Sequence, residues 1–150
     1  MWLDPEKLSE WSYKYCKFIK DDPEIRKNIT KSCWAYWYCL LKEDKPEVRT
    51  LITKLEWAFH YCQYVKDRPE VWKLITDSFW AYNYCKFIKD RPDIRKKITD
   101  SYWAYSYCLW KKDDPEIRKN ITESHWADSY CKNVKNDPEV RKYIKEGECG

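Results

Sequence analysis

A step of 23 residues governs this chain and limits the folds that it can adopt. Three residue types keep that step in phase along the chain. Proline stands at Pro23, Pro46, Pro69, Pro92, Pro115 and Pro138. Cysteine stands at Cys16, Cys39, Cys62, Cys85, Cys108 and Cys131, and tryptophan at Trp11, Trp34, Trp57, Trp80, Trp103 and Trp126. Such phase locking identifies a tandem array, in which each repeat is one supersecondary unit that shares a core with its neighbours.

The repeat, D-x-P-E-I/V-R-K-x-I-T-x-S-x-W-A-Y-x-Y-C, predicts two helices in each unit. Proline in the first turn of the first helix needs no amide partner, and the acidic residue after it suits the positive helix end. Ile25 and Ile29 lie at i, i+4 on one face, which predicts a first helix of about two turns. We expect its N-caps at the junction aspartates, because a carboxylate there accepts hydrogen bonds from free first-turn amides. These residues are Asp21, Asp44, Asp67, Asp90 and Asp113.

The second helix of each unit follows a Thr-x-Ser segment. We expect the serine to cap this helix, except in the repeat where Leu55 takes its place. The serines are Ser32, Ser78, Ser101 and Ser124. Trp34, Ala35, Tyr38 and Cys39 then lie at i, i+1, i+4 and i+5, which forms a broad apolar stripe with helical period. No alternation with a period of two persists, so strands are not expected.

Neither helix can bury its apolar stripe alone, whereas stacked neighbours can. The predicted fold is therefore all-α: an α-solenoid of about six 23-residue helix-turn-helix repeats, each with a short first helix and a longer second helix. We expect a single repeat domain over residues 1–150. It comprises an irregular N-terminal cap at 1–10, repeats at 11–145 and a flexible tail at 146–150.

Composition excludes several function classes. Only two glycines are present, too few for a phosphate-cradling loop or a nucleotide-binding fold. The net charge of +4 is too small to indicate nucleic acid by itself. Charges throughout the first twenty residues argue against a secretory signal, and no run approaches the roughly 18 apolar residues of a membrane span. We therefore expect a cytoplasmic protein with reduced cysteines.

The cysteine ladder could suggest metal or disulfides. Cysteines one repeat apart should lie ~9–10 Å from each other, about one helix diameter. A disulfide needs Cα atoms within about 7 Å, and no zinc-type spacing is present. The ladder is therefore interpreted as one small buried core position, with no metal and no cofactor. Cys33 and Cys149 lie outside the ladder and are expected to be the more exposed thiols.

No set of residues suggests catalysis, and we expect no enzyme. His60 and His125 occupy different repeat positions and share no obvious partner. Glu56 and His60 lie at i, i+4 on one helix face, which we interpret as a surface pair.

Rows of basic residues leave nucleic-acid binding as one alternative. Arg26, Arg49, Arg95, Arg118 and Arg141 align, and so do Lys20, Lys66, Lys89, Lys112 and Lys135. Such rows could follow phosphates while nearby aromatic residues stack bases. Acidic residues three positions before a lysine should, however, neutralise the face locally. These pairs are Glu24–Lys27, Glu70–Lys73, Asp93–Lys96, Glu116–Lys119 and Glu139–Lys142.

Three positions of the second helix change freely from repeat to repeat, while the core positions barely change. They follow one another at i, i+4 and i+8 and therefore share one stripe. Aromatic and short polar residues are typical of binding surfaces. The predicted partner-binding residues are Trp37, His60, Tyr64, Phe79, Asn83, Phe87, Tyr102, Ser106 and Trp110. The favoured function is a non-catalytic scaffold that binds a macromolecule, with a protein as the partner. Unconstrained drift on a wet surface is the alternative interpretation of the stripe.

The string Trp103-Ala104-Tyr105-Ser106-Tyr107-Cys108, followed by Asp114-Pro115-Glu116-Ile117-Arg118-Lys119, resembles short W-A-Y-x-Y-A/C tandem repeats of bacterial and bacteriophage proteins. The resemblance covers residues 11–145 and extends distantly to leucine-rich-repeat-variant and HEAT-type arrays. It implies an α-solenoid of phage or bacterial origin, and a host or defence protein as a partner that the chain would block. It implies no reaction.

Self-assembly is a further alternative. The array closes on a lone first helix from Pro138 to Lys145, and its first repeat is truncated. Repeat ends without polar caps can stack head-to-tail into filaments. Trp2, Leu3 and Leu8 could instead cover the N-terminal end.

Overall fold

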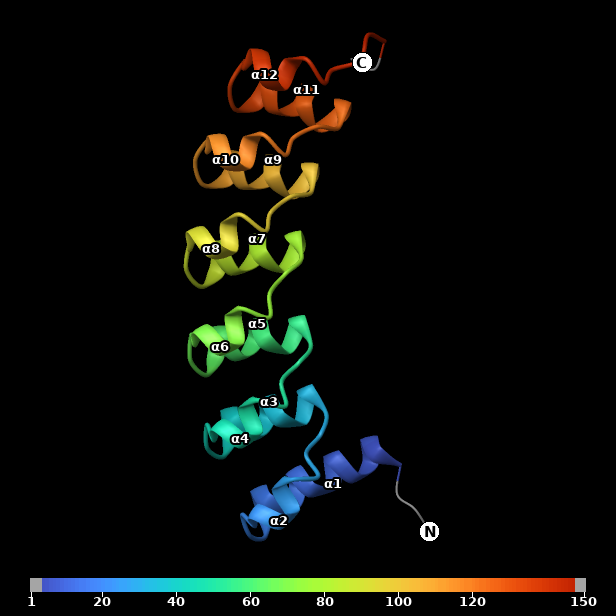
Figure 1. Cartoon of the computed structure of the whole chain (residues 1–150), viewed down its shortest axis with the longest axis vertical. Helices are drawn as coiled ribbons and strands as arrows, with labels where there is room; N and C mark the ends of the chain where they lie inside the picture. The colour runs from blue at the N-terminus through green and yellow to red at the C-terminus, as the bar shows by residue number, and fades with distance from the viewer. Residues whose placement is uncertain (1–3, 148–150) are drawn as a thin grey trace. The chain divides into compact units, whose positions relative to one another are not determined.

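The structure is a computed structural model that describes residues 4–147, and within that range it contains helices and their connections but no strand. The chain divides into two compact units, residues 1–75 and 76–150, and each unit is described by itself. Each contains three pairs of helices, a long helix followed by a short one (Figure 1). The prediction of an all-α repeat fold built from helix-turn-helix pairs is confirmed.

The first unit contains α1 (Pro5–Phe18), α2 (Pro23–Arg26), α3 (Ser32–Leu41), α4 (Pro46–Arg49), α5 (Leu55–Tyr64) and α6 (Pro69–Trp72). The second contains α7 (Ser78–Phe87), α8 (Pro92–Arg95), α9 (Ser101–Trp110), α10 (Pro115–Arg118), α11 (Ser124–Asn133) and α12 (Pro138–Arg141). Within a unit, each long helix packs against the short helix after it and against the next long helix. The arrangement buries apolar stripes that a helix of this length could not bury alone.

The short helices are shorter than predicted. After one α-helical turn, the chain continues with tighter i to i−3 hydrogen bonds: Asn28 N–H donates to Ile25 O at 3.0 Å, and Ile29 N–H to Arg26 O at 2.9 Å. This 3₁₀-type turn carries Ile29 into the core, where it is fully buried. Burial of one isoleucine, rather than the i, i+4 pattern, thus decides where the α-helix ends.

The predicted N-caps of the short helices were wrong by one residue. The cap is the residue directly before proline, as in Asp22, whose carboxylate accepts a 2.9 Å hydrogen bond from Glu24 N–H. Asp114 and Asp137 do the same, whereas Lys45, Arg68 and Arg91 cap without a side-chain bond. Proline requires an extended residue before it, so the cap falls at that position. The earlier aspartates serve another purpose, described below.

The core consists of residues that repeat. From α3 onward, each long helix contributes a buried alanine and a buried tyrosine, and a buried isoleucine follows each short helix from α2 to α10. Among the described residues the fully buried ones include Ala35, Ala58, Ala81, Ala104, Ala127, Tyr38, Tyr61, Tyr84, Tyr130, Ile29, Ile75, Ile98 and Ile121. The ladder cysteines are buried too, except Cys131, which is half-buried. The interpretation of the cysteine ladder as a packing position is confirmed; Cys33 is half-buried, and Cys149 lies outside the described residues.

The serines do not cap their own helices as predicted, because each is the first residue inside its helix. Ser101 Oγ accepts hydrogen bonds from Thr122 N–H at 2.9 Å and Glu123 N–H at 3.1 Å, and donates to Asn120 O at 2.9 Å. Ser32 and Ser78 bind the start of the following long helix in the same way. The hydroxyl therefore satisfies free amides of the next repeat.

The irregular start of the array folds as one helix. α1 joins the predicted cap to the first long helix without a break. Ser9 takes the serine position in it and accepts a hydrogen bond from Lys31 N–H at 3.1 Å. Of the residues proposed to cover this end, Trp2 and Leu3 lie outside the described residues, and Leu8 is half-buried. None of the helices within residues 4–147 has both the length and the apolar character needed to cross a membrane.

Candidate partner-binding surface

The predicted stripe lies on the long helices and is largely open to solvent. Its large aromatic side chains are between 37% and 60% exposed. These are Trp37, Tyr64, Phe79, Phe87, Tyr102 and Trp110. The remaining members, His60, Asn83 and Ser106, are half-buried. Three of the residues, Trp37, His60 and Tyr64, belong to the first unit. The other six belong to the second unit.

In the first unit, the exposed rings are braced by a buried one. The ring of Tyr36 lies 5.2 Å from that of Trp37, 5.3 Å from that of Trp57 and 6.1 Å from that of His60. The ring of His60 in turn stacks on that of Tyr64 at 6.1 Å. Tyr36 is buried and supports the exposed rings of the cluster. Its burial also raises the pKa of its hydroxyl. His60 is therefore part of an aromatic surface.

In the second unit, α7 and α9 share a larger set of rings. Phe79 meets the edge of Trp103 at 5.1 Å, and the buried Tyr82 lies 5.1 Å from Trp103 and 6.5 Å from Trp110. Asn83 donates its amide to Phe79 O at 2.8 Å on the same helix. The stripe residues of these two helices thus form one patch on a shared floor of repeated aromatic residues.

The patch continues to α11 and becomes polar there. The ring of Tyr102 lies 4.7 Å from that of Trp126, and Tyr105 stacks on the same indole at 5.6 Å. Asn133 donates an amide hydrogen bond to Tyr105 Oη at 3.2 Å. The sequence interpretation missed these supporting rings, because they occupy repeated positions and were assigned to packing alone. They do both, since each indole is half-buried and also carries an exposed neighbour.

Lysines flank the rings at the C-terminal ends of α7 and α9. The ammonium group of Lys86 lies 5.4 Å from the ring centroid of Phe87, 5.8 Å from that of Trp110 and 5.5 Å from that of Tyr82, whose hydroxyl it also contacts at 3.3 Å. Lys111 lies 5.5 Å from the Trp110 ring. Sequence reasoning missed these lysines, although Lys86 directly precedes a stripe position. They give this end of the patch positive charge beside apolar area.

The arginine row of the short helices is engaged in ion pairs, except Arg141, which donates a hydrogen bond to Asn136. Arg49 Nε lies 2.9 Å from Asp44 and its Nη1 2.8 Å from Glu70. Arg26 makes equivalent contacts with Asp21 at 3.1 Å and Glu47 at 2.7 Å. The row therefore offers little free positive charge to phosphates.

Most of the junction aspartates, which do not cap the short helices, bind these arginines instead. Burial by itself would raise the pKa of Asp44, but hydrogen bonds from Arg49 and Tyr61 outweigh it and hold that pKa below its usual value. The pKa of Asp90 is likewise lowered, because hydrogen bonds from Arg95 and Tyr107 outweigh burial. The aspartates remain ionised and hold the repeats together.

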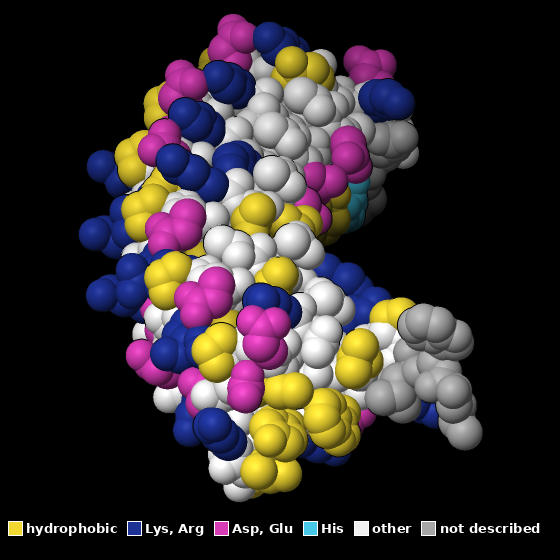
Figure 2. All heavy atoms as spheres, turned by 60° about the horizontal axis from the view of Figure 1, so that its bottom comes forward, with side chains coloured by type: hydrophobic (Ala, Val, Ile, Leu, Met, Phe, Trp, Pro, Cys, Tyr) yellow, Lys and Arg dark blue, Asp and Glu magenta, His cyan; other side chains and the backbone are white. Residues whose placement is uncertain are grey.

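The predicted acid–lysine pairs are confirmed on α2, α8, α10 and α12. Their separations are 2.7 Å for Glu24–Lys27, 3.0 Å for Asp93–Lys96, 2.6 Å for Glu116–Lys119 and 2.7 Å for Glu139–Lys142. Figure 2 shows acidic and basic side chains interspersed on the side that carries the short helices. This face is a solvated network of ion pairs, and exposed pairs of this kind contribute little to stability.

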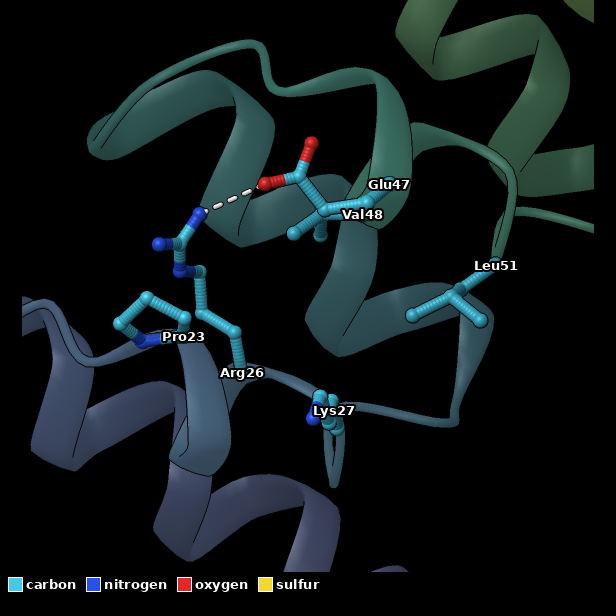
Figure 3. Close-up of a pocket in the computed structure, with 6 residues that line it drawn as sticks. All are labelled: Pro23, Arg26, Lys27, Glu47, Val48 and Leu51. Atoms are coloured by element: carbon cyan, nitrogen blue, oxygen red, sulfur yellow. Dashed lines mark hydrogen bonds and ion pairs between the residues drawn. The ribbon is translucent and has the colours of Figure 1, made fainter.

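Grooves also lie between successive short helices. The one in Figure 3 has a volume of about 340 Å³ and is lined by Pro23, Arg26, Lys27, Glu47, Val48 and Leu51. Similar grooves recur between α4 and α6 and between α10 and α12. Because the groove is copied with the repeat and is bridged by the Arg26–Glu47 ion pair, it reflects the stacking geometry. Its lining repeats with the array except mainly at one position, which is Leu51 here and Leu74 and Tyr143 in the other two grooves.

The chemistry of the remaining groups is that of packing. Burial raises the pKa of the thiols of Cys39 and Cys85 to about 12, so both remain protonated at neutral pH. Within residues 4–147, no three or more His, Cys, Asp and Glu side chains gather in a way that could hold a metal ion. The absence of catalysis stays a prediction.

Comparison of the chain with protein-family models, with curated proteins and with solved structures gave no match. The resemblance to bacterial and phage repeats therefore stays a hypothesis that rests on the quoted motifs. The function has to be argued from the surface itself.

Proposed function

We propose that this protein is a non-catalytic repeat scaffold that binds a partner protein through the aromatic stripe of its long helices. One observation carries the proposal: the variable positions display exposed rings that are held in place by repeated, buried ones. In the second unit, Phe79 and Tyr102 each lie near 5 Å from the half-buried indole of Trp103. An isolated exposed residue would be unremarkable, whereas a continuous patch of rings favours an interaction site.

Braced aromatic rings suit protein recognition for a physical reason. Large side chains that are already ordered lose little conformational entropy on binding, and they bury much apolar area per residue. Tyrosine and tryptophan also dominate the binding energy of known interfaces. The resemblance to phage repeats makes a host or defence protein the first partner class to test.

Nucleic acid is the less favoured partner. The arginines that would follow phosphates are paired with carboxylates, as Arg95 is with Asp90 and Asp114 at 3.0 Å each. The exposed lysines of the short helices face an acid three residues earlier. The aromatic stripe and the arginine row also lie on different helices, so these two do not form one groove in which backbone and bases are held together.

The test is affinity capture from a lysate of the organism that carries the gene. A variant with Phe79, Tyr102 and Trp110 replaced by alanine should lose the captured protein. The matched control is Leu109→Ala, because Leu109 is 52% exposed on α9 but is not part of the stripe. Circular dichroism should show equal helicity for both variants. Capture that is unchanged in the triple variant would contradict the proposal.

Light scattering over a concentration series should accompany the capture. A constant monomer mass is expected if the stripe serves a different protein. A mass that grows with concentration would instead support the head-to-tail filament, the alternative function, and the alanine variants would show whether the stripe contributes to it.

A further inference from the structure

We infer that the part of the stripe at the ends of α7 and α9 binds an acidic segment of the partner, in which carboxylates flank an apolar anchor. The inference rests on the proposed function and specifies the chemistry of its ligand. The surface concerned, called the basic aromatic patch, consists of Lys86, Phe87, Lys89, Trp110, Lys111 and Lys112.

The exposed rings of the basic aromatic patch lie beside an ammonium group. Phe87 is 57% exposed and Trp110 is 41% exposed, and Lys86 lies close to both. Tyr82 lies beneath them and holds Lys86 through its hydroxyl. Two large apolar side chains and an ammonium group thus share one small area on adjacent helices of the second unit. An aliphatic or aromatic anchor would pack against the ring surface that the ammonium group leaves open, and a carboxylate would bind the ammonium group beside it.

The lysines of the patch provide its positive charge. Lys89 and Lys112 are exposed, and no carboxylate of the described residues lies within ion-pair distance of them or of Lys86. Lys111 approaches Asp90 only at 4.0 Å. These lysines lie at the C-terminal ends of the helices, where a positive charge is favourable. Lys86, Lys89 and Lys112 therefore carry positive charge without a carboxylate partner among the described residues, whereas Lys111 lies at the limit of an ion pair with Asp90.

Nearby carboxylates could neutralise this charge only if they were free. Asp90 and Asp113 lie at the same ends of the helices, but both are occupied. Asp90 accepts hydrogen bonds from Arg95 at 3.0 Å and from Tyr107 at 2.8 Å. Asp113 is bound by Arg118 and by Tyr130. The carboxylates that cap α7 and α9 lie at the opposite ends of the helices, where they bind backbone amides.

Single-stranded nucleic acid is the other class of anion that binds to exposed aromatic rings. Bases stack on open ring faces. Lys86 lies over both Phe87 and Trp110, and Lys111 lies over Trp110 as well. A base would have to displace these ammonium groups, whereas a carboxylate can bind them where they are. The geometry thus favours the peptide.

The first unit offers an internal contrast. Tyr64 occupies the position of Phe87 and Trp110 and is equally exposed, but Gln63 stands where Lys86 precedes Phe87. Lys66 is its nearest equivalent of Lys89. A charge reversal at Lys66 therefore provides a control of the same type, on a ring that lacks the flanking ammonium group.

The experiment is a selection of random 16-residue peptides displayed on phage against the full chain, with counter-selection against a Phe87→Ala/Trp110→Ala variant. The enriched peptides should carry Asp and Glu on both sides of Leu, Phe or Trp. Binding of a synthetic enriched peptide should weaken with salt. It should fall roughly 10-fold or more in a Lys86→Glu/Lys89→Glu/Lys112→Glu variant, and stay unchanged in Lys66→Glu. A Lys89→Glu/Lys112→Glu variant, which leaves Lys86 on the rings, guards against a folding defect and should lose part of the affinity.

Three results would overturn the inference: enriched peptides that are neutral or basic, no enrichment over the counter-selection, or affinity that is indifferent to the charge reversals. Tighter binding of a 20-residue oligothymidylate, abolished by the same reversals, would also overturn it in favour of nucleic acid. Each of these leaves the lysate capture by the stripe unaffected. If instead peptides bind as expected but capture survives the triple alanine variant, the proposed function fails and the patch stands.

Discussion

The hydroxyl of Tyr38 donates a 2.8 Å hydrogen bond to Asp21, which lies 17 residues earlier in the preceding repeat. The same bond recurs between Tyr107 and Asp90 at 2.8 Å. Arginine approaches the aspartate from its own short helix, as Arg26 does with Asp21. Asp21 and Asp90 therefore each join a buried tyrosine of one repeat to an arginine of the preceding one. A satisfied polar network of this kind fixes how neighbouring repeats stack.

Replacing Tyr107 by phenylalanine should destabilise the protein by about 1.5–3 kcal/mol, the usual contribution of a hydrogen bond to a charged group. The ring would still fill its place in the core, and Asp90 would keep Arg95 as a partner. Urea denaturation followed by circular dichroism measures the change. Tyr64→Phe, at an exposed ring, is the control and should change the unfolding free energy by less than about 0.5 kcal/mol. Equal effects of the two substitutions would refute a stabilising role for the Tyr107–Asp90 bond.

Stability should fall in acid because the pKa values of Asp44 and Asp90 are lower in the folded protein than in the unfolded chain. For a lowered pKa the stabilisation is complete above the unfolded value, near 4, and is lost as pH falls through the folded value below it. Asp90→Asn should therefore be less stable than wild type at pH 7, and the difference should shrink below about pH 4. Asn136 occupies this position in the last repeat and accepts a 2.9 Å bond from Arg141, so asparagine fits there.

Unfolding free energies at pH 7, 5, 4 and 3 test this expectation. Glu116→Gln is the control, since the Glu116–Lys119 pair is exposed and should contribute little at any pH. A difference between wild type and Asp90→Asn that stays constant from pH 7 to pH 3 would show that ionisation of Asp90 does not stabilise the fold.

Ser101→Ala should cost about 1–3 kcal/mol, because two backbone amides of the next repeat lose their shared acceptor in a buried place. Thermal and urea unfolding provide the measurement. Ser106→Ala is the matched control on the same helix, at a half-buried position of the stripe. If both serines tolerate alanine equally, solvent must satisfy the amides of Thr122 and Glu123, and the link between repeats is dispensable.

The ladder thiols should resist alkylation in the folded protein. Cys62 and Cys108 are buried like Cys39 and Cys85, and burial raises the pKa of Cys108 to about 11. Iodoacetamide at pH 8 should therefore modify the buried ladder cysteines only after unfolding, because the thiolate is the reactive form. Peptide mass spectrometry with and without urea measures this, and the half-buried Cys131 is the internal comparison. Rapid modification of Cys39 in the native protein would contradict its place in the core.

The candidate site was predicted in part. The variable positions were recognised by comparing the repeats with one another, and the structure exposes Phe79, Tyr102 and their equivalents. The lysines beside them were not recognised, because their importance depends on an ammonium group reaching rings of two helices at once. Sequence spacing along a single helix does not contain that information.

By itself, the sequence determined the repeat, the helix pairs and the core positions, because each follows from local periodicity and from residues with strong backbone preferences. Tertiary structure alone decided where the polar groups go. Asp21 and Ser32 were assigned to their own helices, yet their partners lie 17 and 21 residues away, on neighbouring repeats. A short side chain at a helix end can satisfy local or distant amides equally well. Only the stacking of the next repeat, which buries Tyr38 and brings the backbone amides just before α5 to Ser32, determines which partner is bound.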